Sequence, residues 1–130
     1  MIEILKAIPF FAELSEEDLQ AIGQKVQMQY FGPEQVIFEE GDYGEEMYVI
    51  KRGRVQVIRD FSIIAELSSG AFFGEMALVS DEPRNATIKA VDETEALVLK
   101  KEDFRELLES KPSIASKVSY EVVKRANKLS

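Results

Sequence analysis

The chain has 130 residues, of which 24 are acidic, 16 are basic and none is histidine or cysteine, so its net charge is −8. Because nucleic-acid backbones are bound by clustered lysine and arginine, this balance argues against a nucleic-acid-binding face. Without histidine or cysteine, the chain excludes serine–histidine hydrolases, histidine-ligated metals and cysteine-based zinc sites.

The amino-terminal segment resembles neither a secretion signal nor a membrane anchor. IEILKAIPFFAEL has an acidic residue at position 3 and no basic region ahead of its apolar residues, unlike a signal peptide. No uninterrupted apolar run approaches the roughly 18 residues of a membrane-spanning helix. We therefore expect one soluble, cytoplasmic domain over residues 1–130, with no membrane contact.

Residues 1–28 are predicted to be helical. In SEEDLQAIGQKV, Ser15 precedes Asp18 by three residues, which is the pattern of a helix N-cap with an acidic partner. Leu19, Ile22 and Val26 then fall on one helical face. These apolar residues are expected to pack in the core.

Residues 29–100 are predicted to form strands. Short apolar runs such as QVIF, MYVIK, RVQVI, ATIKA and ALVLK are separated by turn residues. Many short strands spaced about ten residues apart are typical of an antiparallel sandwich or barrel. The stretch EEMYVIKRGRVQVIRD predicts a hairpin, with the basic piece KRGR at 51–54 as its solvated tip.

Helical periodicity returns in residues 101–130. Phe104, Leu107 and Leu108 share a face, and Pro112 opens a last helix. Apolar residues at helical spacing in that helix leave two interpretations open, packing on the barrel or contact with a second copy in a homodimer. These residues are Val118, Val122, Ala126 and Leu129.

The segment FGEMALVSDEPRNAT, residues 73–87, combines groups suited to a nucleotide. Gly74 has no Cβ, so a ligand can approach its backbone closely. A helical turn after it would aim the free N–H groups of residues 76–78 at one point, where phosphate oxygens fit. Arg84 adds a charged fork for bidentate phosphate binding. The Glu75 carboxylate can accept a hydrogen bond from a ribose hydroxyl.

A simpler interpretation of Arg84 stays open at this point. Its acidic neighbours Asp81 and Glu82 could hold it in a surface salt bridge worth about 0–1 kcal/mol.

FGEMALVSDEPRNATIKA resembles the phosphate-binding cassette of the cyclic nucleotide-binding domain family, which opens on F-G-E-x-A-L and closes on P-R-x-A-T. Three further stretches are similar to family motifs in the same order, and together they cover nearly the whole chain. They are IPFFAELSEEDL, VIFEEGDYGEEMYVIKRGRVQV and VLKKEDFRELLESKP. The resemblance implies a mainly β fold with flanking helices. This fold is an eight-stranded antiparallel β-roll (jelly roll or double-stranded β-helix) at 29–100, with N-terminal helices at 1–28 and two C-terminal hinge and lid helices at 101–130.

The resemblance also implies roles for individual residues. Arg84 would pair with the exocyclic phosphate of cAMP, or of cGMP, and Glu75 would accept from the ribose 2′-hydroxyl. Backbone N–H groups of Ala77 and Asn85 would meet the phosphate, and residues 125–130 would reach the base. The implied binding set is Gly74, Glu75, Met76, Ala77, Arg84, Asn85, Ala86 and Thr87.

Three features depart from the family pattern. Asn85 replaces a small residue, Glu34 stands at a usual glycine, and the hairpin RDFSIIAEL is shorter than usual. None of them removes a group implied to bind ligand.

Three function classes follow from these residues. The first is a non-catalytic regulatory sensor that relays cyclic nucleotide binding through its C-terminal helices to an unknown effector, without cofactor or metal. The second is a structural or dimerisation domain of the same fold with an empty pocket. The third is an enzyme. A cupin-like oxygenase lacks imidazole ligands, and a glycosidase pair of Glu75 with Asp81 or Glu82 lacks an aromatic sugar platform.

Overall fold

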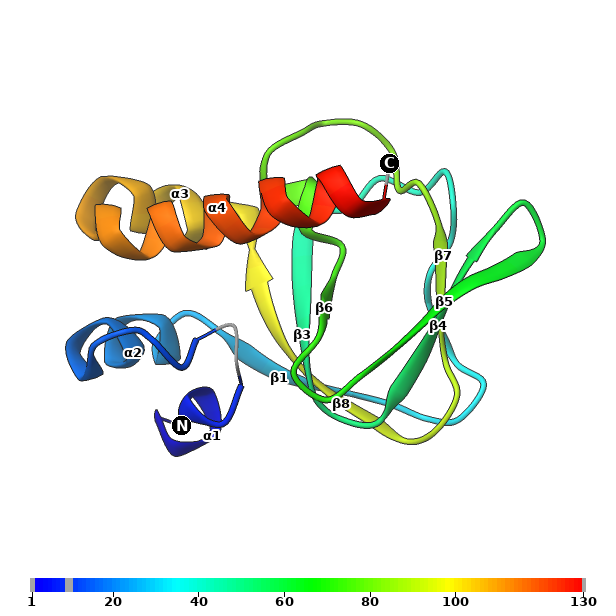
Figure 1. Ribbon diagram of the computed structural model, residues 1–130, viewed down its shortest axis with the longest axis horizontal. Coiled ribbons are helices and arrows are strands. Elements are labelled where there is room, and N and C mark those ends of the chain that lie inside the picture. The colour runs from blue at the N-terminus through cyan, green and yellow to red at the C-terminus, as the bar shows by residue number, and fades with distance from the viewer. Residues whose placement is uncertain (1, 9–10, 130) are drawn as a thin grey trace.

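The structure is a computed structural model that describes residues 2–8 and 11–129. Side chains at positions 108, 115, 118, 122 and 125–129 are outside this description. Two four-stranded sheets form a roll, and the helices gather at one end of it (Figure 1).

The helices are α1 (Ile2–Lys6), α2 (Glu16–Gly23), α3 (Lys101–Ser110) and α4 (Pro112–Leu129), and η1 (Glu75–Leu78) is a 3₁₀ turn. The strands are β1 (Gln27–Phe31), β2 (Val36–Phe38), β3 (Glu46–Arg52), β4 (Arg54–Arg59), β5 (Ser62–Ser68), β6 (Phe72–Phe73), β7 (Thr87–Ala90) and β8 (Thr94–Lys100). One sheet has the order β1-β8-β3-β6 and the other β2-β7-β4-β5, with every pairing antiparallel. The expected eight-stranded roll is confirmed, and its first strand begins two residues before the predicted Gln29.

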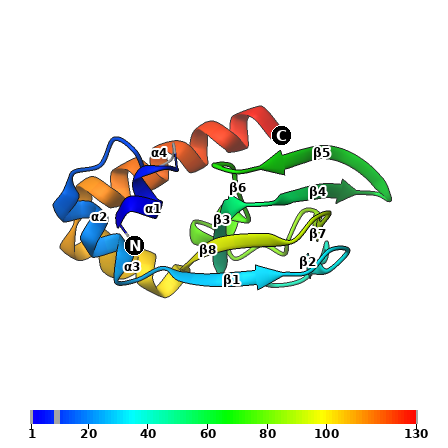
Figure 2. The ribbon, with the colours of Figure 1, turned by 90° about the horizontal axis from the view of Figure 1, so that it is seen from below.

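Apolar side chains form two buried clusters. One joins the helices to the first sheet and includes Leu5, Leu19, Ile22, Phe104 and Ile114. The other fills the roll between the sheets and includes Phe31, Ile50, Val55, Ala86 and Ile88. Figure 2 shows α1, α2 and α3 beyond one end of the strands, and α4 extending from there toward β5. The roll therefore keeps its own core, and the helices pack against the outside of one sheet.

The predicted Ser15 N-cap of α2 is confirmed, whereas the Asp18 carboxylate, its predicted reciprocal partner, bonds elsewhere. The Ser15 hydroxyl accepts a hydrogen bond from the Asp18 backbone N–H at 3.1 Å, which satisfies one of the free amides at the helix start. The Asp18 carboxylate accepts a hydrogen bond from Ser113 at 3.2 Å, which ties α2 to the start of α4. Leu19 and Ile22 are buried in the helical cluster as expected.

The predicted hairpin around Gly53 is wrong, because β3 and β4 lie in different sheets. Gly53 has φ +108° and turns the chain from one sheet to the other, and a Cβ there would lie 2.5 Å from the Glu93 carbonyl oxygen. The alternation of apolar and polar residues continues on both sides of Gly53. It therefore does not indicate that the chain passes from one sheet to the other there.

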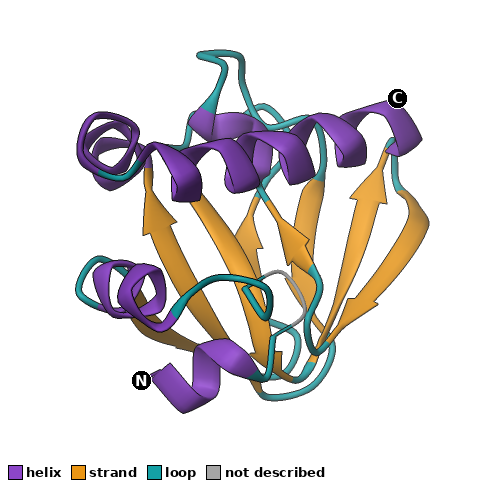
Figure 3. Cartoon of the chain, turned by 60° about the vertical axis from the view of Figure 1, so that its left-hand side comes forward, coloured by secondary structure: helices purple, strands orange, loops and turns teal. Residues whose placement is uncertain are grey.

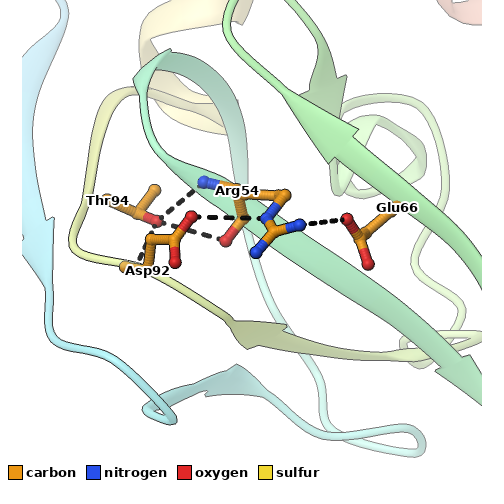
Figure 4. Close-up of polar contacts among 4 residues, drawn as sticks. All are labelled: Arg54, Glu66, Asp92 and Thr94. Carbon is orange, nitrogen blue, oxygen red and sulfur yellow. Dashed lines mark hydrogen bonds and ion pairs between the residues drawn. The ribbon is translucent and has the colours of Figure 1, made fainter.

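The basic piece at 51–54 is solvent-exposed as predicted, but it lies at a corner between the two sheets and its cations are paired with carboxylates. The Arg54 guanidinium contacts Glu66 at 3.0 Å and Asp92 at 3.3 Å (Figure 4). Lys51 and Arg52 both pair with Glu95, at 3.2 and 2.9 Å. This leaves no concentrated positive surface at the corner.

Glu34 occupies a strained turn position. We predict that the free energy of unfolding of Glu34→Gly is about 1 kcal/mol larger than that of Glu34→Ala, so that the glycine variant is the more stable. The Gln35 N–H donates to the Gly32 carbonyl at 3.2 Å, and Glu34 has φ +69°, as in a type II turn that favours glycine at this position. Both variants lose the ion pair with Lys89, so their difference isolates the backbone. Urea unfolding measures it, and equal stability would contradict the strain.

Candidate functional site

Gly74 and η1 connect β6 to the loop that precedes β7. Gly74 adopts the left-handed conformation with φ +74°, and a Cβ there would lie 2.9 Å from Arg84 Nη1. Within η1, Ala77 is buried and Met76 is exposed. The N–H groups of residues 76–78 were predicted to be free. The Ala77 N–H instead donates to the Gly74 carbonyl in a long hydrogen bond of 3.3 Å.

Arg84 points into the protein, and only 9% of its surface is exposed. Its Nη1 donates to the Gly74 carbonyl and its Nη2 to the Glu46 carbonyl, each at 3.0 Å. The guanidinium also lies 4.0 Å from the centre of the Phe38 ring, a cation–π contact. Residues from β2, β3 and the start of η1 therefore fix the position of this one cation.

Gly44 makes room for the guanidinium. A Cβ at this position would lie 2.4 Å from Nη2 and 2.5 Å from Nε of Arg84. The Nε itself is buried and has no hydrogen-bond partner among the described residues. Such an orphaned buried donor calls for an explanation, and a role in binding an anionic ligand is one.

Arg84 remains a charged group despite its burial. Burial lowers the pKa of the guanidinium, while attraction to the carboxylates of Glu46, Glu75 and Asp42 raises it. An arginine pKa starts so high that the group stays protonated. The Glu75 carboxyl is itself buried, so the two groups expected to bind phosphate and ribose lie in one electrostatic environment.

The backbone around Arg84 is anchored to the loop before β3. The Arg84 N–H donates to the Asp42 carbonyl at 2.7 Å, and the Arg84 carbonyl accepts from the Gly41 N–H at 2.8 Å. These bonds hold the end of the cassette against the segment that contains Gly44.

The remaining predicted residues continue from this anchor into β7. Asn85 is exposed, and its carbonyl accepts a hydrogen bond from Arg59 Nε at 3.0 Å. Ala86 is buried in the roll, and the Thr87 hydroxyl accepts from the Glu40 N–H at 2.9 Å. Ala86 thus packs in the core and Thr87 ties two loops together, so ligand contact is not needed to explain either side chain.

A surface salt bridge from Arg84 to Asp81 or Glu82 does not form. Asp81 pairs with Lys101 at 2.6 Å, and no ion pair among the described residues reaches Arg84. The Glu82 N–H donates to the Ser80 hydroxyl at 3.1 Å. The simpler interpretation of Arg84 is therefore wrong, and the carboxylate of Asp81 already has a cationic partner.

Lys101 ties the start of α3 to the cassette. It is 9% exposed, and its Nζ donates to the Ser80 carbonyl at 3.4 Å and to the Asp81 carboxylate at 2.6 Å. Both α3 and α4 contact η1, and Figure 3 shows α4 crossing above the ends of the strands. The positions proposed for α4 packing, Val118, Val122, Ala126 and Leu129, and the base-contacting residues 125–130 lie outside the described side chains.

The Lys101 contact predicts a specific pH dependence. Hydrogen bonding and attraction to Lys101 lower the pKa of Asp81, so the contact stabilises the fold above the unfolded pKa of about 4 and is lost as pH falls through the lower folded value. We expect wild type to be more stable than Asp81→Asn at pH 7 and the difference to shrink as the pH falls below about 4. Urea unfolding at several pH values measures it, and a constant difference would contradict the ion pair.

Three neighbours of Arg84 were missed in the sequence. They are Phe38, Gly44 and the carbonyl of Glu46, which lies 38 positions before Arg84. VIFEEGDYGEE shows only a strand and a turn, so no local signal linked these residues to the cassette.

A family profile described as cyclic nucleotide-binding domain matches residues 28–111. The chain belongs to the cyclic nucleotide-binding domain family. The matched range contains the whole cassette and the loop that holds Gly44. The family expected from the sequence motifs is thereby confirmed.

Relatives of several architectures share this domain. A cAMP-dependent protein kinase regulatory subunit from Eremothecium gossypii is 34% identical over 82% of this chain and 23% of its own length. A cyclic nucleotide-gated potassium channel from Rhizobium etli is 35% identical over 95% of this chain and 34% of its own length. The crystal structure of the catabolite activator protein from Thermus thermophilus aligns with a TM-score of 0.83 and 29% identity, over 92% of this chain and 59% of that one. The chain thus spans a quarter to a third of the two relatives compared by sequence.

Two kinds of feature are absent from the described residues. None of their helices is both long enough and apolar enough to cross a membrane. No group of three or more acidic side chains among them could hold a metal ion.

Proposed function

We propose that this cyclic nucleotide-binding domain is a non-catalytic, cytoplasmic sensor that binds cAMP through residues 74–87. The observation that carries the proposal is Arg84, a buried cation without an ion-pair partner among the described residues and with an orphaned Nε. A cation held in this way is suited to an anionic ligand, because a charged hydrogen bond formed away from water is stronger than an exposed one.

Each group of the site has a defined role in this proposal. A guanidinium has five N–H donors. Two of those of Arg84 donate to the carbonyls of Gly74 and Glu46. In this proposal the others bind the exocyclic phosphate oxygens without loss of those bonds. Gly74 allows the phosphate close to the backbone, Glu75 accepts from the 2′-hydroxyl, and the Asn85 N–H is a further phosphate donor.

The ligand signal would leave the site through α3. Ser80 and Asp81 follow η1 directly and hold Lys101 at the start of α3. A ligand that binds one arrangement of η1 more tightly shifts the population of conformations, and this contact would pass the shift to α3 and α4. An effector protein or domain would respond to this change in α3 and α4, as the names of the kinase and channel relatives suggest. A homodimer through α4 remains a prediction.

We propose cAMP ahead of cGMP because the regulatory-subunit relative is described as cAMP-dependent. Asn85 is exposed, and its amide can donate to or accept from either base. The nucleotide preference therefore needs a direct comparison of the two ligands.

A second candidate is a structural domain with an unused pocket. It is favoured by the two hydrogen bonds of Arg84 to Gly74 and Glu46, which join β3 to η1 without any ligand. In that account, Arg84 is a structural cross-link.

Thermal melting with added nucleotide separates the two candidates. The domain is first unfolded and refolded to remove nucleotide carried through purification. A ligand that binds only the folded state at 100 times its Kd adds about 2.7 kcal/mol to the free energy of unfolding. We therefore expect cAMP to raise the melting temperature and cGMP to raise it less. No shift with either nucleotide would favour the structural domain.

A further inference from the structure

The tip of the β4–β5 hairpin carries an exposed apolar surface. Arg59 pairs with Ser62, so Asp60 and Phe61 form a two-residue turn. Phe61 is fully exposed, and Ile63 and Ile64 on β5 are 60% and 46% exposed. Figure 1 shows this hairpin projecting away from the body of the roll. We call Phe61, Ile63 and Ile64 the hairpin tip surface.

The backbone of the turn is strained at its phenylalanine. Asp60 and Phe61 have φ values of +51° and +65°, as a two-residue turn of this kind requires, and such turns favour Asn-Gly. A bulky residue at positive φ is a conformational outlier. Folding alone would therefore favour glycine at position 61, and burial does not compensate because the ring is in solvent.

The surface continues along an open strand. β5 is the last strand of its sheet and pairs with β4 alone among the described strands. An edge strand presents unpaired backbone N–H and C=O groups to which another extended segment can add. The register shift between Val57 and Ile58 sets Ile64 at the irregular point of the edge, where its side chain is available to a partner.

Two carboxylates and one guanidinium lie around the tip, so its local charge is net negative. Asp60 lies in the turn, and its N–H donates to the carboxylate of Glu40 at 3.4 Å. Neither carboxylate forms an ion pair within the part of the chain that the structure describes. The neighbouring Arg59 is turned to the Asn85 carbonyl. With this local charge and a net charge of −8 over the whole chain, a basic segment is a more suitable partner here than a second copy or an anionic membrane.

We propose that the β5 edge and the hairpin tip surface bind an extended segment of another protein in which apolar residues alternate with lysine or arginine. The partner backbone adds to β5, its apolar side chains cover Phe61 and Ile64, and its basic side chains meet Asp60 and Glu40. None of the three residues of the hairpin tip surface belongs to the cassette.

A selection of short random peptides displayed on phage tests the proposal. Wild type is the target and Phe61→Gly is the counter-selection protein. We expect enriched peptides with alternating apolar and basic residues, which bind Phe61→Gly about tenfold or more weakly, as when a buried aromatic anchor is lost. Phe61→Gly should melt at the same or a higher temperature, which shows that it is folded. Two N-methylated forms of an enriched peptide can be made, one for each alternating set of backbone amides. The form that methylates the amides facing β5 should not bind.

Four results would overturn the proposal. They are no enriched peptide family, enriched peptides that bind both proteins equally, self-association in sedimentation that Phe61→Gly abolishes, or co-sedimentation with phosphatidylserine vesicles that depends on Phe61. The third would assign the surface to a second copy and the fourth to a membrane.

Discussion

Replacing Arg84 with alanine is expected to weaken cAMP binding about 10- to 150-fold. The variant removes the buried cation, and a hydrogen bond to a charged group is worth about 1.5–3 kcal/mol. Calorimetric titration of cAMP into each protein measures the loss. Arg84→Lys keeps the charge but cannot form the planar fork, so we expect its affinity to lie between those of wild type and Arg84→Ala.

The same variants report on stability. Arg84→Ala leaves the carbonyls of Gly74 and Glu46 without their donor, and the loss of a buried partner costs about 1–3 kcal/mol. Urea unfolding should therefore show a less stable but folded domain. If Arg84→Ala lowered stability and bound cAMP as tightly as wild type, Arg84 would be the structural cross-link of the second candidate.

Gly44→Ala is expected to weaken cAMP binding about tenfold or more without removing any group that contacts ligand. The new Cβ would lie 2.4 Å from Arg84 Nη2, so the guanidinium must move. The displaced atoms are the end of a flexible side chain, and stability should therefore fall less than in Arg84→Ala. Calorimetry and urea unfolding of the same preparation separate the two effects.

Gly32→Ala is the matched control for this variant. A Cβ at Gly32 would meet only Gln35 Oε1, at 4.0 Å, and Gly32 does not adopt a positive φ. It should bind cAMP as wild type does. Unchanged affinity in Gly44→Ala as well would contradict the claim that Gly44 positions the guanidinium.

The helices and short strands were predictable from the sequence because their signals are local, whereas the eight-stranded roll was implied by the family resemblance. The Ser15 cap, the short strands with turn residues and the return of helical spacing after Lys100 all depend on residues close in the chain, and the structure confirms them. The turn at Gly53 misled the prediction because alternation shows only that a residue faces in or out. It does not say which sheet the next strand joins.

The candidate site was predictable only in part. The motif gave Gly74, Glu75 and Arg84, and the structure brings these three into one region. The groups that hold Arg84 come from Phe38, Gly44 and Glu46, and their role exists only after β2 and β3 pack beside the cassette. The position of a side chain between distant strands is a tertiary property, which spacing along one segment cannot show.

Calorimetric titration of cAMP into the refolded, nucleotide-free domain, beside Arg84→Lys at the same concentration, tests the central claim most directly. We predict one site per chain with micromolar or tighter affinity for wild type and clearly weaker binding for Arg84→Lys. No heat of binding from a folded wild-type domain, or equal affinities for the two proteins, would contradict the claim that Arg84 binds the phosphate of a cyclic nucleotide.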